Sequence, residues 1–180
     1  LMRSNHDGIL TSAKTIIDDN PRLTCRIYGL EDRSPSRIIL DNKLKIPIRS
    51  KIIKEATNYP TIIFYNKFNK KKIKLLQNSK IKMIKIPLNK DEDLDLRKAL
   101  IKTSQLGFTR IFLESGLNLT TNFLNENLVD DLKLFISSKN LGINGSGNIK
   151  NHLKFFLRNK KNIIEKINLF GDTLKFYRMK

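Results

Sequence analysis

Short apolar runs, separated by polar stretches of helix length, recur along this chain. The runs are as long as typical strands and comprise Gly8-Ile9-Leu10, Arg37 to Leu40, Thr61 to Tyr65, Ile81 to Ile86, Arg110 to Leu113 and Leu132 to Ile136. Strands that alternate with helices are typical of a mostly parallel sheet covered on both faces. The pattern therefore predicts a three-layer α/β fold.

The clearest helix is predicted for Leu94 to Leu106. Asp91 to Asp93 are expected at its N-terminus, where negative charge is favourable, and Gly107 is expected to end it. A 3.6-residue repeat places its apolar face on Leu96, Leu100, Thr103 and Leu106. The lysine-rich segment Lys67 to Lys74 indicates a helix face that is exposed to solvent.

The end of the chain has a different pattern. Asn162 to Phe170 and Thr173 to Met179 are strand-like and are separated only by Gly171-Asp172. A two-residue connection that begins with glycine is typical of a β-hairpin. The sequence therefore predicts a C-terminal antiparallel hairpin, lying at the edge of the parallel sheet.

The amino-acid composition limits the classes of protein to which this chain can belong. The chain has 180 residues and 39% hydrophobic content, which is enough for one domain, residues 1–180, with its own core. Its single cysteine excludes an internal disulfide, and no Cys/His spacing is typical of a zinc site, so no metal is predicted. No run approaches 18 apolar residues, so membrane insertion is not predicted and a cytoplasmic location is expected.

The formal net charge of +18 indicates an anionic partner. Nucleic acid, an acidic membrane surface and phosphorylated small molecules all fit this charge. Lysine outnumbers arginine, however, and specific phosphate recognition favours the planar fork of arginine. Much of the excess charge is therefore also explained by compositional bias.

Polar side chains follow the first predicted strand directly. In open α/β sheets the ligand crevice lies at the carboxyl ends of the strands, so the hydroxyls of Thr11, Ser12 and Thr15 are candidates for ligand contact. Capping of the following turn is the alternative interpretation. The turn Asp19-Asn20-Pro21 comes next, and Arg22 and Arg26 bracket a segment that is suited to holding a phosphate.

A second candidate lies where the predicted strand ending at Leu113 gives way to a helical pattern. Glu114 would face the crevice and accept hydrogen bonds from a polar ring; a cap or a salt bridge is the alternative. Gly116 allows a ligand to approach closely the backbone amides of a helix start, which favour phosphate.

The segments "LTSAKTIIDDNPRLTCR" and "FLESG", with "PSRIILDNKLKIP" between them and "LFGDTLKFYRM" at the end, resemble the reductase domain of the bifunctional riboflavin biosynthesis deaminase–reductase. The likeness runs from Leu1 to Met179 and implies a dihydrofolate reductase-like fold. It further implies NADPH-dependent reduction of 5-amino-6-(5-phosphoribosylamino)uracil to the ribitylamino product by hydride transfer, with positioning in place of a catalytic side chain. The family's first strand and an upstream deaminase domain are expected to be lacking, and the H-x-E and P-C-x-x-C zinc pattern of the deaminase half is missing.

The resemblance also assigns residues to ligands. It places the phosphorylated pyrimidine substrate on Arg3, Leu23, Arg26 and Glu114. It places NADPH on Thr15, Asp19, Asn42, Gly116, Leu117, Asn118, Leu119, Thr120, Thr121 and Asn122. It further implies a homodimer. A cation near the adenosine ribose would favour the 2′-phosphate of NADPH, and Lys43 is the preferred candidate.

Two alternatives remain open at this point. One is a related pteridine or pyrimidine reductase of the same fold, because fold does not fix substrate. The other is a basic nucleic-acid-binding domain. The chain lacks the interleaved aromatics of a stacking platform and has no tryptophan, so no specific nucleic acid is expected.

Overall fold

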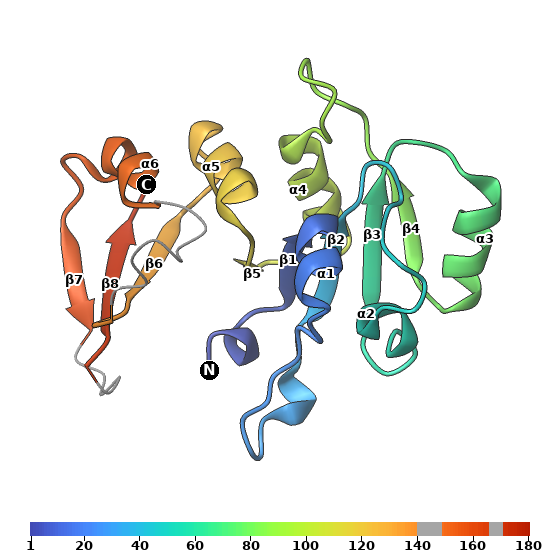
Figure 1. The fold of residues 1–180 in the computed structure, drawn as a ribbon, viewed down its shortest axis with the longest axis horizontal. Helices are drawn as coiled ribbons and strands as arrows, with labels where there is room; N and C mark the ends of the chain where they lie inside the picture. The colour runs from blue at the N-terminus through green and yellow to red at the C-terminus, as the bar shows by residue number, and fades with distance from the viewer. Residues whose placement is uncertain (140–148, 166–170) are drawn as a thin grey trace. The chain divides into compact units, whose positions relative to one another are not determined.

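The computed structural model describes residues 1–139, 149–165 and 171–180 (Figure 1). The chain divides into two compact units, Leu1–Gly116 and Leu117–Lys180. Each unit has its own sheet and its own core, and the two are described separately below.

The first unit is built on a five-stranded sheet with the order β4-β3-β2-β1-β5, in which every pair is parallel. All five predicted strands are confirmed: β1 Gly8–Ser12, β2 Ser36–Leu40, β3 Thr61–Tyr65, β4 Lys82–Lys85 and β5 Ile111–Leu113. The central strands are buried on both faces, and all five residues of β3 are buried. This explains why their sequences are continuous apolar runs without polar alternation.

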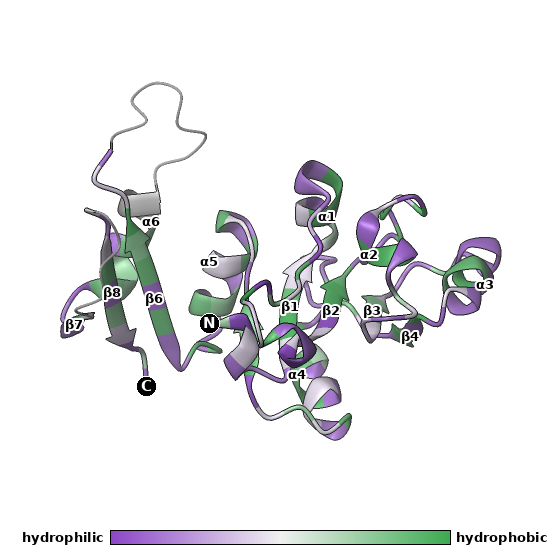
Figure 2. Cartoon of the chain, turned by 90° about the horizontal axis from the view of Figure 1, so that it is seen from below, coloured by the Kyte–Doolittle hydropathy of each residue, from purple (hydrophilic) through white to green (hydrophobic). Residues whose placement is uncertain are grey.

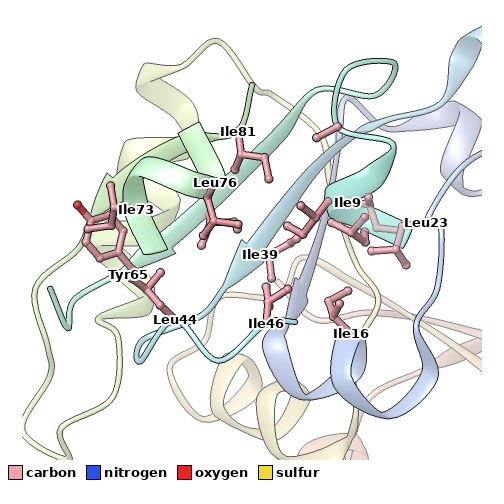
Figure 3. Packing of buried hydrophobic residues seen from close by; sticks show 14 residues of the cluster. Ile9, Ile16, Leu23, Ile39, Leu44, Ile46, Tyr65, Ile73, Leu76 and Ile81 are labelled. Atoms are coloured by element: carbon pink, nitrogen blue, oxygen red, sulfur yellow. The ribbon is translucent and has the colours of Figure 1, made fainter. Parts of the chain in front are cut away.

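Helices cover both faces of this sheet, as predicted. Figure 2 shows α4 (Leu96–Gln105) on the opposite side of the sheet from α1 (Ala13–Asp19) and α2 (Lys51–Lys54). On the α1 side, Ile9, Ile39 and Ile63 from three neighbouring strands form one core with side chains of α1, α2 and α3 (Lys70–Asn78) (Figure 3). The lysines of α3 surround two buried residues, Ile73 and Leu76, so the helix face is amphipathic.

The N-terminus of α4 differs from the predicted one. The helix begins at Leu96, and Asp95 is its N-cap, with a side chain that accepts a hydrogen bond from the Lys98 N–H at 3.0 Å. Asp91 to Asp93 lie in the preceding turn instead, where Asn89 Oδ1 accepts hydrogen bonds from the amides of Asp91 and Asp93. A capping side chain must lie next to the first turn, and Asp95 alone does so. Gly107 follows the helix with φ +92°, as predicted for a helix stop.

The second unit contains α5 (Leu117–Asn125), β6 (Asp131–Ile136), α6 (Ile149–Leu157), β7 (Asn162–Glu165) and β8 (Thr173–Arg178). The predicted strand at Leu132 to Ile136 is confirmed as β6. It belongs to a separate antiparallel sheet of order β6-β8-β7, and not to the parallel sheet. The residues of β6 alternate between exposed and half-buried, which is typical of a strand with one solvated face.

The C-terminal antiparallel hairpin is confirmed, but it lies in this second sheet and not at an edge of the parallel one. Part of the predicted first strand, residues 166–170, falls outside the described residues. Glu165 pairs with Leu174, whereas a two-residue turn at Gly171-Asp172 would pair Glu165 with Arg178, so the observed register differs from the predicted one. On one face the sheet packs Tyr177, Leu132 and Leu134 against Leu124 and Leu153 of the helices.

In the part of the chain that the structure describes, no helix is long and apolar enough to cross a membrane.

Asp7 ties the amino ends of β1 and β5 together. Its Oδ2 accepts hydrogen bonds from the Thr109 hydroxyl at 2.6 Å and from the amides of Thr109 and Arg110, both at 2.8 Å. These bonds, led by the Thr109 hydroxyl, hold the pKa of Asp7 below its ordinary value. The carboxylate form is therefore the one that stabilises the fold.

We expect Asp7→Ala to lower the free energy of unfolding at pH 7 by about 1 kcal/mol, because an exposed acceptor of this kind contributes that order of stability. A lowered folded-state pKa gives stability that is present above the ordinary carboxyl pKa and lost as pH falls through the folded value. The difference from the unsubstituted chain, measured by urea unfolding, should therefore shrink below about pH 4. Asp32→Ala, at an exposed position, is the control, and a pH-independent difference would contradict this role of Asp7.

Candidate functional site

Polar side chains gather at one edge of the parallel sheet. Because all five strands run the same way, their carboxyl ends share this edge, and β5, β1 and β2 are neighbours there. Ser12 ends β1, Asp41 and Asn42 follow β2, and Glu114 follows β5. The Glu114 amide donates to the Leu10 carbonyl at 3.0 Å, so Glu114 continues the pairing of β5 with β1. This edge is where open α/β sheets bind ligands.

Arg3 and Glu114 form a two-pronged ion pair at this edge. The Arg3 Nε donates to Glu114 Oε2 at 3.0 Å, and Nη2 donates to Oε1 at 2.6 Å. A third donor, Nη1, reaches the Thr24 carbonyl at 2.9 Å. The structure thus brings together two residues that the sequence assigned to one site. The salt-bridge interpretation of Glu114 is confirmed, and its contact with a ligand stays a prediction.

Thr24 lies within the loop Asn20–Arg26, which follows α1. Asn20 ends the helix in the left-handed conformation with φ 44°, and Leu23 is also left-handed with φ 59° while only 1% exposed. A buried leucine seldom adopts this backbone region, so surrounding contacts must hold it there. Leu23 packs into the main core of the first unit, in the same cluster as Ile9 and Ile16 (Figure 3).

The two arginines of this loop have different surroundings. Arg22 Nε lies 3.0 Å from Glu55 Oε1, so its charge is already paired. Arg26 is exposed and, among the described residues, makes no hydrogen bond or ion pair. Of the two cations predicted to bracket a phosphate, Arg26 is the one left available for a ligand.

Arg37 is a buried residue that the sequence did not single out. Its guanidinium is inaccessible to solvent and donates to the carbonyls of Ile52 and Tyr59, both at 3.0 Å, and to Thr61 Oγ1. A weaker bond of 3.3 Å reaches the Arg22 carbonyl at the start of the loop. Burial lowers the pKa of Arg37 to about 10, which leaves it charged at neutral pH. An arginine that opens an apolar strand is a weak signal, because strand ends are commonly polar.

The hydroxyl side chains that follow β1 were predicted either to contact a ligand or to cap the next turn, and they differ in their observed partners. Ser12 is the N-cap of α1 and accepts a hydrogen bond from the Thr15 amide at 3.3 Å, so its capping role is confirmed. Thr15 is half-buried, and its hydroxyl lies 3.3 Å from that of Ser12. The buried Thr11 hydroxyl has no hydrogen-bond partner among the described residues. It is a polar group without the partner that burial normally requires.

Asn42 organises the loops beyond β2. Its side-chain amide donates to the Glu92 carbonyl at 3.0 Å, and its own carbonyl accepts from the amides of Asn66 and Lys67. These bonds give Asn42 a structural role, and its contact with NADPH stays a prediction. Lys43 and Asp19 are both exposed, and no bond joins Asp19 to the Arg3–Glu114 pair.

The N-terminus of helix α5, in the second unit, is the helix start that the sequence predicts as a phosphate site. Helix α5 begins at Leu117, directly after Gly116, which is exposed, and an added Cβ there would meet nothing within 4 Å. Phe123 and Leu124 anchor the far end of the helix by burial. Leu117 to Asn122 therefore form the first turns of a helix that Gly116 directly precedes, as the sequence predicted for this segment.

Solved structures define the class of this fold. A pyrimidine reductase-like protein from Corynebacterium diphtheriae matches with a TM-score of 0.73 and 16% identity, covering 98% of this chain and 77% of that one. The riboflavin biosynthesis reductase of Saccharomyces cerevisiae matches with a TM-score of 0.70 and 21% identity, covering 98% and 76%. The fold is therefore the dihydrofolate reductase-like α/β fold that the resemblance predicted.

Sequence comparison identifies the family within that class. The chain belongs to the RibD C-terminal domain family, whose model matches residues 1–168. The riboflavin biosynthesis protein RibD of Aquifex aeolicus is 30% identical over 176 residues, covering 94% of this chain and 47% of that protein. The 2,5-diamino-6-ribosylamino-4(3H)-pyrimidinone 5′-phosphate reductase of Archaeoglobus fulgidus is 22% identical, covering 95% and 78%. This chain thus spans about half the length of its RibD relatives.

Proposed function

We propose that this chain is an NADPH-dependent reductase domain of riboflavin biosynthesis. Its substrate would be 5-amino-6-(5-phosphoribosylamino)uracil, and its product the ribitylamino compound. Membership of the RibD C-terminal domain family supports this proposal. The structural observation that carries it is the Arg3–Glu114 pair bonded to the Thr24 carbonyl, with Arg26, which has no ion-pair partner among the described residues, two residues further along the same loop.

For the substrate we propose a site made by Arg3, Leu23, Arg26 and Glu114. An exposed guanidinium without a protein partner is suited to the doubly charged ribose 5-phosphate, because arginine binds phosphate oxygens through two parallel hydrogen bonds. Leu23 fixes the course of the loop through its buried side chain. The pyrimidine would then lie at the Glu114 end of the site.

For the cofactor, the residues of this chain fit a dinucleotide. Gly116 leaves open space beside the amides that start α5, and such amides favour pyrophosphate. The family resemblance also assigns Thr15, Asp19 and Asn42 to NADPH. When bound, NADPH supplies the hydride that reduces the sugar carbon. The protein binds and orients the two reactants, which makes their reaction effectively unimolecular without a nucleophilic side chain.

A related pyrimidine phosphate is the second candidate substrate, since the Archaeoglobus fulgidus relative is named for a diaminopyrimidinone phosphate. We also propose that the chain acts as a homodimer in the cytoplasm. Phe135 and Ile163 lie on one face of the second sheet and are 55% and 64% exposed, which supports a second copy as their cover. The free, buried Cys25 accords with a reducing compartment.

The proposed function is tested by following NADPH absorbance at 340 nm with the purified chain. Oxidation is expected with 5-amino-6-(5-phosphoribosylamino)uracil. The diaminopyrimidinone phosphate, offered in a parallel reaction, decides between the two candidate substrates. If neither compound supported oxidation above the rate without substrate, the chain would not be a reductase of these pyrimidines.

Arg26→Ala and Gly116→Val should separate the two ligands. The first removes a charge-assisted phosphate contact worth roughly 1.5–3 kcal/mol, so substrate binding should weaken about tenfold or more while NADPH binding changes little. The second places a branched side chain where the pyrophosphate would approach and should mainly weaken NADPH binding. Fluorescence titration gives the NADPH affinity, and the KM of the pyrimidine reports the substrate. An equal loss of both ligands in either variant would count against this division.

Lys43 is proposed to select NADPH over NADH. It is exposed directly after β2, where a cation can meet the 2′-phosphate of the cofactor. Lys43→Glu should therefore raise the KM for NADPH far more than the KM for NADH. Lys71→Glu, on an exposed position of α3, makes the same charge change elsewhere and serves as the control. An unchanged ratio of the two KM values would remove Lys43 from the site.

A further inference from the structure

The Arg3 guanidinium links the end of β5 to the loop Asn20–Arg26. Both oxygens of Glu114 accept hydrogen bonds from Arg3, at 2.6 and 3.0 Å, in a two-pronged arrangement that fixes the plane of the guanidinium. In that plane Nη1 points at the Thr24 carbonyl, 2.9 Å away. The side chains of the pair are 21% and 36% exposed, so water screens the contact only in part.

Other contacts hold the loop at Arg22 and at Cys25, and Arg3 is the donor to the Thr24 carbonyl. Arg37 contacts the loop at the Arg22 carbonyl, and the Cys25 amide donates to Ser34 Oγ at 3.0 Å. Neither contact satisfies the Thr24 carbonyl. The Thr24 carbonyl and the Cys25 N–H belong to the same planar peptide unit, so Ser34 and Arg3 together orient it, with Ser34 at its N–H and Arg3 at its carbonyl.

We propose that Glu114 is a positioning residue, which orients Arg3 and through it fixes the loop segment that presents Arg26 to the substrate phosphate. This inference rests on the proposed function, which assigns the phosphate to Arg26. Because each Glu114 oxygen already accepts from Arg3, the geometry assigns the carboxylate to holding the guanidinium. The pair is also close to neutral as a unit, so the net positive charge facing a phosphate is that of Arg26.

A double-mutant cycle tests the proposal, using Glu114→Gln, Arg3→Met and the combined variant. Ribose 5-phosphate is the probe, with its affinity measured by calorimetry, and hydrogen exchange of the Cys25 amide, which donates to Ser34 Oγ, reports the loop. Each single variant should weaken binding of the probe about tenfold and speed exchange at this amide. The combined variant should be no worse than either single one, because Glu114 has no effect without Arg3.

Two controls separate positioning from a general loss of structure. NADPH affinity should be unchanged in all variants, and in turnover Glu114→Gln should raise the KM of the pyrimidine by a larger factor than it changes kcat. Glu31→Gln, the same change at an exposed position, should alter neither the affinity for the probe nor exchange in the loop. Losses that multiply in the combined variant, or unchanged exchange in Glu114→Gln, would overturn the inference.

The outcome also distinguishes this inference from the proposed function. A chain that oxidises no NADPH with either pyrimidine refutes the proposed function, and hydrogen exchange still decides whether Glu114 acts on the loop through Arg3. A chain that turns over normally but shows multiplied losses refutes only the positioning role.

Discussion

A permanent positive charge inside the first unit constrains much of its structure. Arg37 lies at the second position of β2 with no solvent exposure, so water cannot solvate its guanidinium. Burial of an unpaired charge is costly, and the fold must therefore bring oxygens to it. The carbonyls of Ile52 and Tyr59 and the hydroxyl of Thr61 fill this requirement. They fix α2 and the start of β3 against β2, and a longer bond adds the Arg22 carbonyl of the loop after α1.

The same loop meets a second arginine near its other end. Arg37 holds it on the side of the core, and Arg3 holds it on the side of Glu114. Between these two anchors, Leu23 is forced into the left-handed region with its side chain buried. A loop fixed in this way has little conformational freedom to lose when a ligand binds, which favours affinity. The fold thus fixes the backbone that leads to Arg26.

The sequence predicted the strands well because parallel strands buried on both faces leave an unmistakable apolar run, as at Thr61 to Tyr65. It predicted β6 for the parallel sheet, whereas β6 belongs to the separate antiparallel sheet. The polar–apolar alternation of a strand with one solvated face does not indicate which sheet the strand joins. At the candidate site, Glu114 was predictable from its position at a strand end, and Arg3 only from the family resemblance. Their mutual contact was not, because it joins positions 111 residues apart in the chain. The role of Arg37 depends on three carbonyls, and carbonyls are present at every residue.

Cys25 gives the loop a chemical reporter of its own. It is the single cysteine of the chain, it is 5% exposed, and it lies between the carbonyl held by Arg3 and the exposed Arg26. A thiol reagent reaches a buried sulfur only during a local opening, so the rate of modification measures how often that opening occurs. Because no other thiol competes, this rate describes the motion of one loop without labelling or substitution elsewhere. The rate of Cys25 modification is therefore a measure of how firmly the loop Asn20–Arg26 is held.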